Sequence, residues 1–141
     1  MIEIRFGLLL GLFCVLFPTF ASGQSSDSCS VDGLANAERR LCYSKALQKL
    51  NLEVELTVKD FISQFRAGGT DRRDSPVAAD EYRKAATAMM SAQQLWKKYR
   101  EQHCQAVAHS YTTGSGAGTA YEACRFRVTQ ERLAELRNAF Q

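Results

Sequence analysis

Cysteine and histidine are the residue types in this chain best suited to metal binding or nucleophilic catalysis. Among its 141 residues are two histidines, His103 and His109, and five cysteines, Cys14, Cys29, Cys42, Cys104 and Cys124. A thiolate beside an imidazole can hold zinc or attack a carbonyl, and His103 directly precedes Cys104. Whether the cysteines are thiolates depends on the compartment in which the protein folds.

The N-terminal segment predicts that compartment. Residues 6–17 form a run of 12 apolar or glycine residues, and small residues follow at Ala21 and Gly23. Such a run is typical of a secretory signal peptide, and as a helix it would reach only about 18 Å, against roughly 30 Å for a bilayer core. We therefore expect a signal peptide over residues 1–23, cleaved after Ala21 or Gly23, and an exported domain over residues 24–141.

Export changes what the cysteines can do. Cleavage would remove Cys14, and the bulky Phe13 before it argues against a lipoprotein signal. Four cysteines would remain, and an even number in a short exported chain predicts two disulfides. Disulfide-bonded sulfur cannot act as a thiolate, and no Gly-x-Ser-x-Gly segment supplies a serine nucleophile. We expect no catalytic residue, no metal site and no cofactor.

Composition and charge argue against two further binding functions. The formal net charge is only +3, and basic residues are interleaved with acidic ones, so nucleic-acid binding is not expected. The glycine-rich segment 114–118 follows no strand and lacks a closing Lys-Ser/Thr pair. It therefore does not match a phosphate-binding loop.

Apolar residues spaced by three and four predict two long helices. The first begins near Leu34 and ends at Gly68-Gly69, because glycine readily adopts the left-handed conformation at a helix C-terminus. The second begins after Ser75, an N-cap candidate, with Pro76 in its first position. The expected inward faces are Leu41, Leu47, Leu50, Val54, Val58, Phe61 and Phe65 in the first helix, and Tyr82, Ala85, Met89, Ala92, Trp96, Tyr99, His103 and Val107 in the second.

A third helix is predicted after the glycine-rich segment. Thr119 and Glu122 have the spacing of a capping box with Thr119 at the N-cap, so this helix starts at about Ala120 and runs nearly to Gln141. Its inward candidates are Val128, Leu133, Leu136 and Phe140. The expected fold class is all-α, a small antiparallel bundle of three main helices with two disulfides.

The four remaining cysteines allow three disulfide pairings. Cys104 lies late in the second helix and Cys124 early in the third, so a bond between them closes a helical hairpin. Cys29 is then left to tie the lead-in to Cys42 in the first helix. The helical arrangement favours these two pairs, although the sequence alone does not select a pairing.

One stretch of the second helix resembles a known family signature. The motif Ala-Gln-x-x-Trp-x-x-Tyr/Phe-Arg-Asp-x-x-Cys of the LprI-like lysozyme-inhibitor N-terminal domain family is similar to Ala92-Gln93-x-x-Trp96-x-x-Tyr99-Arg100-Glu101-x-x-Cys104, with Glu101 in place of aspartate. Further matching positions are Cys42, Leu50, Asn51, Gly114, Ser115, Tyr121, Cys124, Thr129, Arg132 and Leu136. Val54 replaces a usual aromatic residue. Gly116-Ala117 departs from the family's connecting segment, so a partner contact made by that segment would differ from the family's.

The resemblance implies an exported helical binding protein of the bacterial envelope, and the family is named for lysozyme inhibition. We expect a protein partner, either lysozyme or another envelope or host protein. The candidate contact residues lie around the glycine-rich segment: Tyr111, Gly114, Ser115 and Tyr121. The hydroxyl groups among them suit the two carboxylates of a glycoside-hydrolase cleft.

The overall charge limits this hypothesis. A net charge of +3 gives no attraction to a basic lysozyme, and an acidic patch at Glu53 and Glu55 would offset it only in part. Two interpretations stay open. One is a lysozyme inhibitor, and the other is a periplasmic or secreted interaction module with a non-lysozyme partner.

The signature residues Trp96 and Arg100 also have two interpretations. Tryptophan and arginine dominate binding hot spots, but both residues lie on the stripe that ends at a disulfide cysteine. We expect them to be structural, with Trp96 in the core and Arg100 bridging to Glu122 or Glu131 of the third helix.

Overall fold

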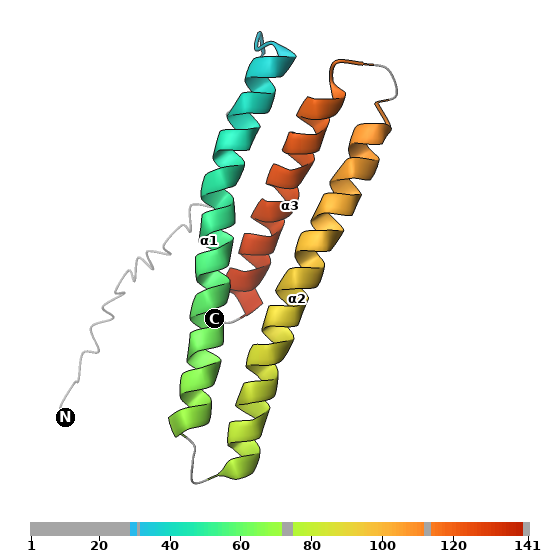
Figure 1. The fold of residues 1–141 in the computed structure, drawn as a ribbon. Helices are drawn as coiled ribbons and strands as arrows, with labels where there is room; N and C mark the ends of the chain where they lie inside the picture. The colour runs from blue at the N-terminus through green and yellow to red at the C-terminus, as the bar shows by residue number, and fades with distance from the viewer. Residues whose placement is uncertain (1–28, 31, 72–74, 112–113, 140–141) are drawn as a thin grey trace, which may run out of the picture.

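The computed structural model describes residues 29–30, 32–71, 75–111 and 114–139. These residues form three helices, α1 (Asn36–Asp71), α2 (Pro76–His109) and α3 (Ala117–Ala139). Successive helices run antiparallel (Figure 1), and the described ranges contain no strand. The predicted all-α bundle of three helices is confirmed. The predicted signal peptide and Phe140 lie outside the described residues.

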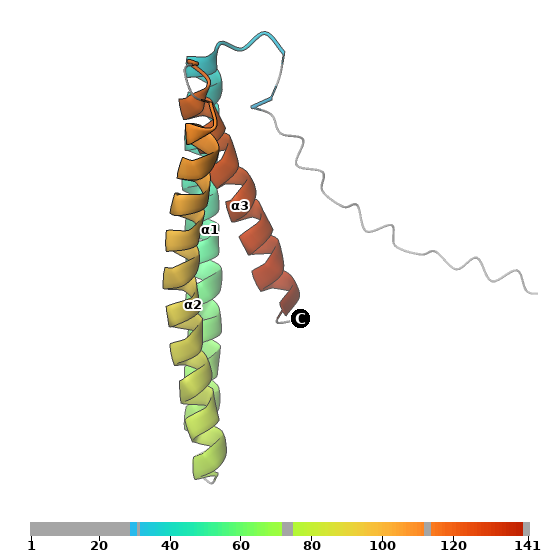
Figure 2. The ribbon, with the colours of Figure 1, turned by 90° about the vertical axis from the view of Figure 1, so that its right-hand side faces the viewer.

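The third helix is shorter than its neighbours, with 23 residues against 36 in α1 and 34 in α2. It starts at the end of the bundle where α1 begins and α2 ends, and it stops well before the opposite end (Figures 1 and 2). The first two helices therefore continue past it as a two-helix hairpin. Among the described helices, none has a stretch long and apolar enough to cross a membrane.

Two apolar clusters hold the helices together. The larger joins two valines of α1 to two leucines of α3: Val54, Val58, Leu133 and Leu136. The second surrounds Cys104 and Cys124 and includes Val128. Trp96 is partly buried and packs against both clusters. Burying each such aliphatic side chain stabilises the fold by about 1.5–3 kcal/mol.

The predicted inward faces are wrong at three positions. Leu41 and Tyr99 are more than half exposed, at 55% and 57%, and Ala92 is exposed as well. The buried line of α2 is instead Ala79, Ala86, Gln93, Arg100 and Cys104. Two of these buried residues, Gln93 and Arg100, are polar. A prediction based on apolar residues therefore chose their neighbours Ala92 and Tyr99, one position earlier in the sequence.

The first helix does not end at its glycine pair, contrary to the prediction. It continues through Gly68 and Gly69 to Asp71. A Cβ on Gly68 would lie 2.8 Å from Cε1 of Tyr82, and one on Gly69 would lie 3.3 Å from the carbonyl oxygen of Ala79. The two glycines therefore let α2 approach α1 closely, and they do not terminate the helix.

The start of α2 follows the prediction. Pro76 is the first helical residue, and the carbonyl oxygen of Ser75 accepts a hydrogen bond from the backbone N–H of Ala79 at 3.0 Å. The Ser75 side chain makes no capping bond. Proline, whose fixed φ suits the first turn, therefore marks this helix start more than the serine does.

Both disulfides join the favoured partners, Cys29 with Cys42 and Cys104 with Cys124. Their Cα atoms are 5.6 Å and 5.5 Å apart, and the bonds close segments with sequence separations of 13 and 20 residues. On the chain-entropy estimate each bond stabilises the fold by roughly 3 kcal/mol.

The close approach at Gly68 predicts an unusual response to alanine. In an open helix position, Gly68→Ala should raise the free energy of unfolding by up to about 1 kcal/mol. Here the added methyl group meets the ring of Tyr82, so we expect no gain or a loss in the wild-type background and a gain in a Tyr82→Ala background. Urea denaturation of the four proteins tests this, and an equal gain in both backgrounds would contradict it.

Candidate functional site

The candidate site is the end of the bundle at which α2 passes into α3. The α2 helix ends at His109 and α3 begins at Ala117, so the connecting segment is residues 110–116 (Figure 1). Cys42 lies near the start of α1 and Cys104 near the end of α2. Both disulfides are therefore found at this end, which gives the connecting segment a covalently braced base.

Asn36, the first residue of α1, contacts both Ser115 of the connecting segment and α3. Its side-chain amide donates a hydrogen bond to the hydroxyl oxygen of Ser115 at 3.1 Å. Its backbone carbonyl accepts a hydrogen bond from the hydroxyl of Thr119 at 2.8 Å. One residue thereby ties the start of α1 to both the connecting segment and α3, and nothing in the sequence pattern had indicated this role.

The predicted capping box at Thr119 and Glu122 is wrong. The third helix starts two residues before Thr119, and the backbone N–H of Ala120 already donates to the carbonyl oxygen of Gly116 at 2.8 Å. Thr119 is buried inside the first turn, where its hydroxyl bonds across to Asn36. An interhelical hydrogen bond has taken the place of the local cap.

Tyr121 belongs to α3 and not to the connecting segment. Its hydroxyl donates to a carboxylate oxygen of Glu101 on α2. The guanidinium of Arg125 lies over the Tyr121 ring, 5.2 Å from the ring centre. The Nε atom of Arg125 is 3.7 Å from a carboxylate oxygen of Glu101. Tyr121 therefore braces α2 against α3, and the part of it left to contact a partner is small.

Tyr111 is the large side chain that this end presents to solvent, with 52% of its surface exposed. It borders two neighbouring hollows of about 320 and 270 Å³, and Ala120 and Ala123 also line both of them. Val107 lines the first hollow and Arg39 the second. Gly114 and Ser115 are also exposed. Together these residues make a shallow, mixed apolar and polar surface around one aromatic ring.

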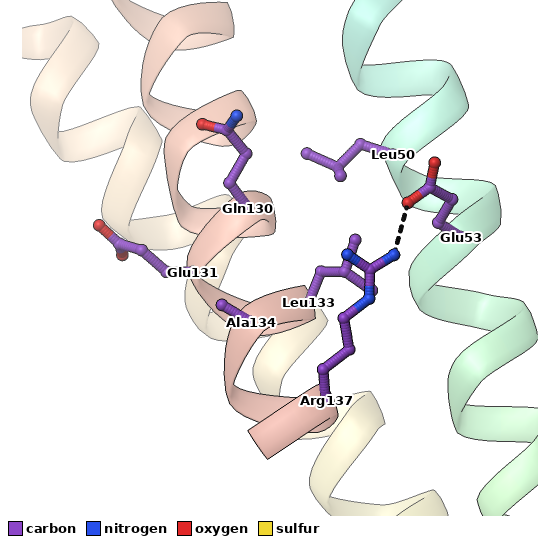
Figure 3. Close-up of a pocket in the computed structure, with 7 residues that line it drawn as sticks. All are labelled: Leu50, Glu53, Gln130, Glu131, Leu133, Ala134 and Arg137. Atoms are coloured by element: carbon purple, nitrogen blue, oxygen red, sulfur yellow. Dashed lines mark hydrogen bonds and ion pairs between the residues drawn. The ribbon is translucent and has the colours of Figure 1, made fainter. Parts of the chain in front are cut away.

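A separate hollow of about 510 Å³ lies between α1 and α3, lined by Leu50, Glu53, Gln130, Glu131, Leu133, Ala134 and Arg137 (Figure 3). Arg137 reaches across it to pair with Glu53 at 3.2 Å. Glu55 is likewise paired with Lys97 of α2 at 2.7 Å. Each carboxylate of the acidic patch considered at Glu53 and Glu55 is therefore paired with a cation from a different helix, which weakens the patch.

The signature residue Arg100 is buried and holds the three helices together. Its guanidinium donates to the side-chain oxygen of Asn51 on α1 at 2.6 Å and to the hydroxyl of Thr129 on α3 at 2.9 Å. The predicted bridge to Glu122 or Glu131 is wrong, because the oxygen partners of Arg100 are neutral. Burial, together with the nearby charge of Arg125, lowers the pKa of Arg100.

The guanidinium groups of two arginines lie over the ring of Trp96. The guanidinium of Arg100 is 4.8 Å from the centre of this ring, and that of Arg132 is 5.9 Å away. Arg132 also donates to the side-chain oxygen of Gln93 at 3.3 Å and pairs with Glu135 at 2.8 Å. The signature therefore divides into a core-facing set, which includes Gln93, Trp96 and Arg100, and the exposed Ala92 and Tyr99.

Catalytic or metal-binding chemistry has little support in the described part of the chain. No group of three His, Cys, Asp or Glu residues there is placed to hold a metal ion. The four cysteines described are all disulfide-bonded. His103 stacks on the ring of Tyr99, with centroids 5.4 Å apart.

Fold and site together define a small, disulfide-bonded helical domain with a braced connecting segment at one end. A family model described as lysozyme inhibitor LprI matches residues 27–136, a range that covers α1, α2 and most of α3. The chain belongs to this family. Comparisons with curated proteins and with solved structures give no match.

The environment of Arg100 predicts a rescue experiment. Thr129→Val removes one oxygen partner from a buried cation, so the free energy of unfolding should fall by about 1–3 kcal/mol. Adding Arg100→Met removes the cation as well and should recover much of this loss, because replacing a buried charge by an apolar isostere is often neutral. Urea denaturation followed by circular dichroism gives both values. A double variant less stable than Thr129→Val alone would contradict this account.

Proposed function

We propose that this protein is an exported, non-catalytic protein that binds lysozyme and inhibits it by covering the catalytic cleft. The observation that carries the proposal is the match to the lysozyme-inhibitor family over residues 27–136, nearly the whole of the described bundle. The contact surface in this proposal is the braced end around Tyr111, Gly114 and Ser115.

The chemistry of that end suits a carboxylate-lined cleft. Glycoside hydrolases work through a pair of acidic side chains, and a blocking surface gains from hydroxyl donors directed at them. Ser115 accepts the hydrogen bond from Asn36, so its own hydroxyl hydrogen can still be donated to a partner. Tyr111 adds a rigid aromatic ring with a polar tip, a side-chain type that is frequent at binding hot spots.

Electrostatic steering makes little contribution to the proposed complex. The net charge is +3, and Glu53 and Glu55 are both engaged in ion pairs. Association with a basic lysozyme would therefore rest on short-range contacts and would proceed without acceleration at low salt.

Export is part of the proposal. Two disulfides fit an oxidising compartment such as the periplasm or the cell exterior. The apolar run at residues 6–17 has the length of a signal-peptide core, and the family match begins only at residue 27. Cleavage after Ala21 or Gly23 would leave the whole matched region in the exported protein.

A second candidate function is an interaction module for a non-lysozyme protein of the envelope or host. The observation that favours it is the exposed pair Leu95 and Tyr99, which lie one turn apart on α2 and outside the connecting segment. Exposed apolar side chains of this size are frequent at protein contacts.

Lysozyme titration with matched variants tests the proposal. We expect the purified protein to slow lysozyme in a turbidity assay of cell-wall lysis. Tyr111→Ala should raise the concentration needed for half-inhibition by roughly tenfold or more, as expected for loss of a hot-spot aromatic. Leu95→Ala, which removes another exposed side chain from α2, is the matched control and should inhibit like the unmodified protein.

Other outcomes decide between the two candidates. Absence of inhibition at a large molar excess over several lysozymes would refute the lysozyme proposal. A stable partner captured from envelope extract by the unmodified protein, and lost with Leu95→Ala but not with Tyr111→Ala, would support the second function.

A further inference from the structure

The outward face of α1 combines exposed leucines with lysines. Leu41, Leu52 and Leu56 are each more than half exposed. Lys45, Lys49 and Lys59 are also exposed. Reading along the helix from Leu41 to Lys59, the steps between these six residues are four, four, three, four and three, so all of them share one face.

This face lies opposite the core. The buried residues of α1 are Tyr43, Leu47, Val54 and Val58. Leu52 and Leu56 are each two positions from Val54, about 200° around the helix. Both partner helices pack on the core side of α1 (Figures 1 and 2), so nothing in the described bundle covers the leucines.

The lysines of this face are free of ion pairs within the described bundle. Lys45, Lys49 and Lys59 take part in no ion pair or hydrogen bond there. Glu53 and Glu55, each four residues from one of these lysines, are paired elsewhere, Glu53 with Arg137 and Glu55 with Lys97. Two acids at the ends of the face keep their charge, because their hydrogen-bond donors are neutral: Glu38 accepts the backbone N–H of Ala35, and Asp60 accepts the side-chain amide of Gln64. The three lysines therefore leave this face with a small positive excess.

We propose that this leucine–lysine face of α1 docks the protein on an anionic lipid surface. Helices that lie in a membrane interface place leucines into the headgroup boundary and lysines against anionic headgroups. The charge complementarity and the exposed leucines on one face satisfy both requirements. A purely anionic polymer would use the lysines and leave the leucines in water. The bundle would lie along the surface, because the face follows the length of α1.

Vesicle co-sedimentation of the full chain tests this inference. We expect binding to vesicles of phosphatidylcholine mixed with phosphatidylglycerol, and weaker binding as salt screens the headgroups. Each basic residue near an anionic surface contributes roughly a fivefold factor in binding. Lys45→Glu/Lys49→Glu should therefore weaken binding by about 25-fold or more. Leu52→Ser/Leu56→Ser should also weaken it.

Matched controls come from α2. Lys84→Glu/Lys98→Glu makes the same change in net charge, and Leu95→Ser removes an exposed leucine, so both should bind almost like the unmodified protein. The apolar run at residues 6–17 is common to all variants. Binding that is equal for Lys45→Glu/Lys49→Glu and the unmodified protein would thus point to that run and overturn the proposal. Equal binding to pure phosphatidylcholine would also overturn it.

Two further measurements separate the remaining explanations. If Leu52→Ser/Leu56→Ser binds vesicles normally and a soluble polyanion competes fully, the face recognises charge alone and the lipid proposal fails. Circular dichroism and the lysozyme titration on the same variants show whether fold and inhibition are intact. The lipid inference does not rest on lysozyme binding, so either can fail while the other stands.

Discussion

The placement of the three helices along one another depends on the buried guanidinium of Arg100. A cation withdrawn from water must find oxygen partners, and Arg100 finds one on each neighbouring helix, Asn51 on α1 and Thr129 on α3. These two bonds fix how far each helix is displaced along the others. The aliphatic clusters supply most of the stabilisation, but apolar contacts alone tolerate sliding, whereas short hydrogen bonds to a buried charge do not.

The two ends of the molecule are built differently because α3 covers only one of them. At the covered end two disulfides and the hydrogen bonds of Asn36 hold the connecting segment. At the other end α1 and α2 rely on each other, and Gly68 lets the Tyr82 ring lie against the helix backbone. A braced end lowers the conformational entropy that a binding segment loses on association. It is therefore the better candidate for contact with a partner.

The two proposed contacts, with a protein and with a lipid surface, use different parts of the helical bundle. The end around Tyr111 would meet a protein partner, and the outward face of α1 would meet a lipid surface. A bundle lying on its α1 face keeps its end free, so both contacts are geometrically compatible. The acids Glu53 and Glu55 serve neither contact, because Arg137 and Lys97 neutralise them.

The sequence by itself determined the three helices and the Pro76 helix start, favoured the two disulfide pairs, and suggested the family through the signature around Trp96. These follow from local properties, namely apolar spacing, proline geometry and the order of cysteines along predicted helices. Only the tertiary structure decided that α1 passes through Gly68, that Thr119 bonds to Asn36 and not to its own helix, and that Arg100 has neutral partners. Asn36 is 83 residues from Thr119 in sequence, and the partners of Arg100 are 49 and 29 residues from it. Side-chain pairing over such separations depends on how the helices pack, and local periodicity does not encode that packing.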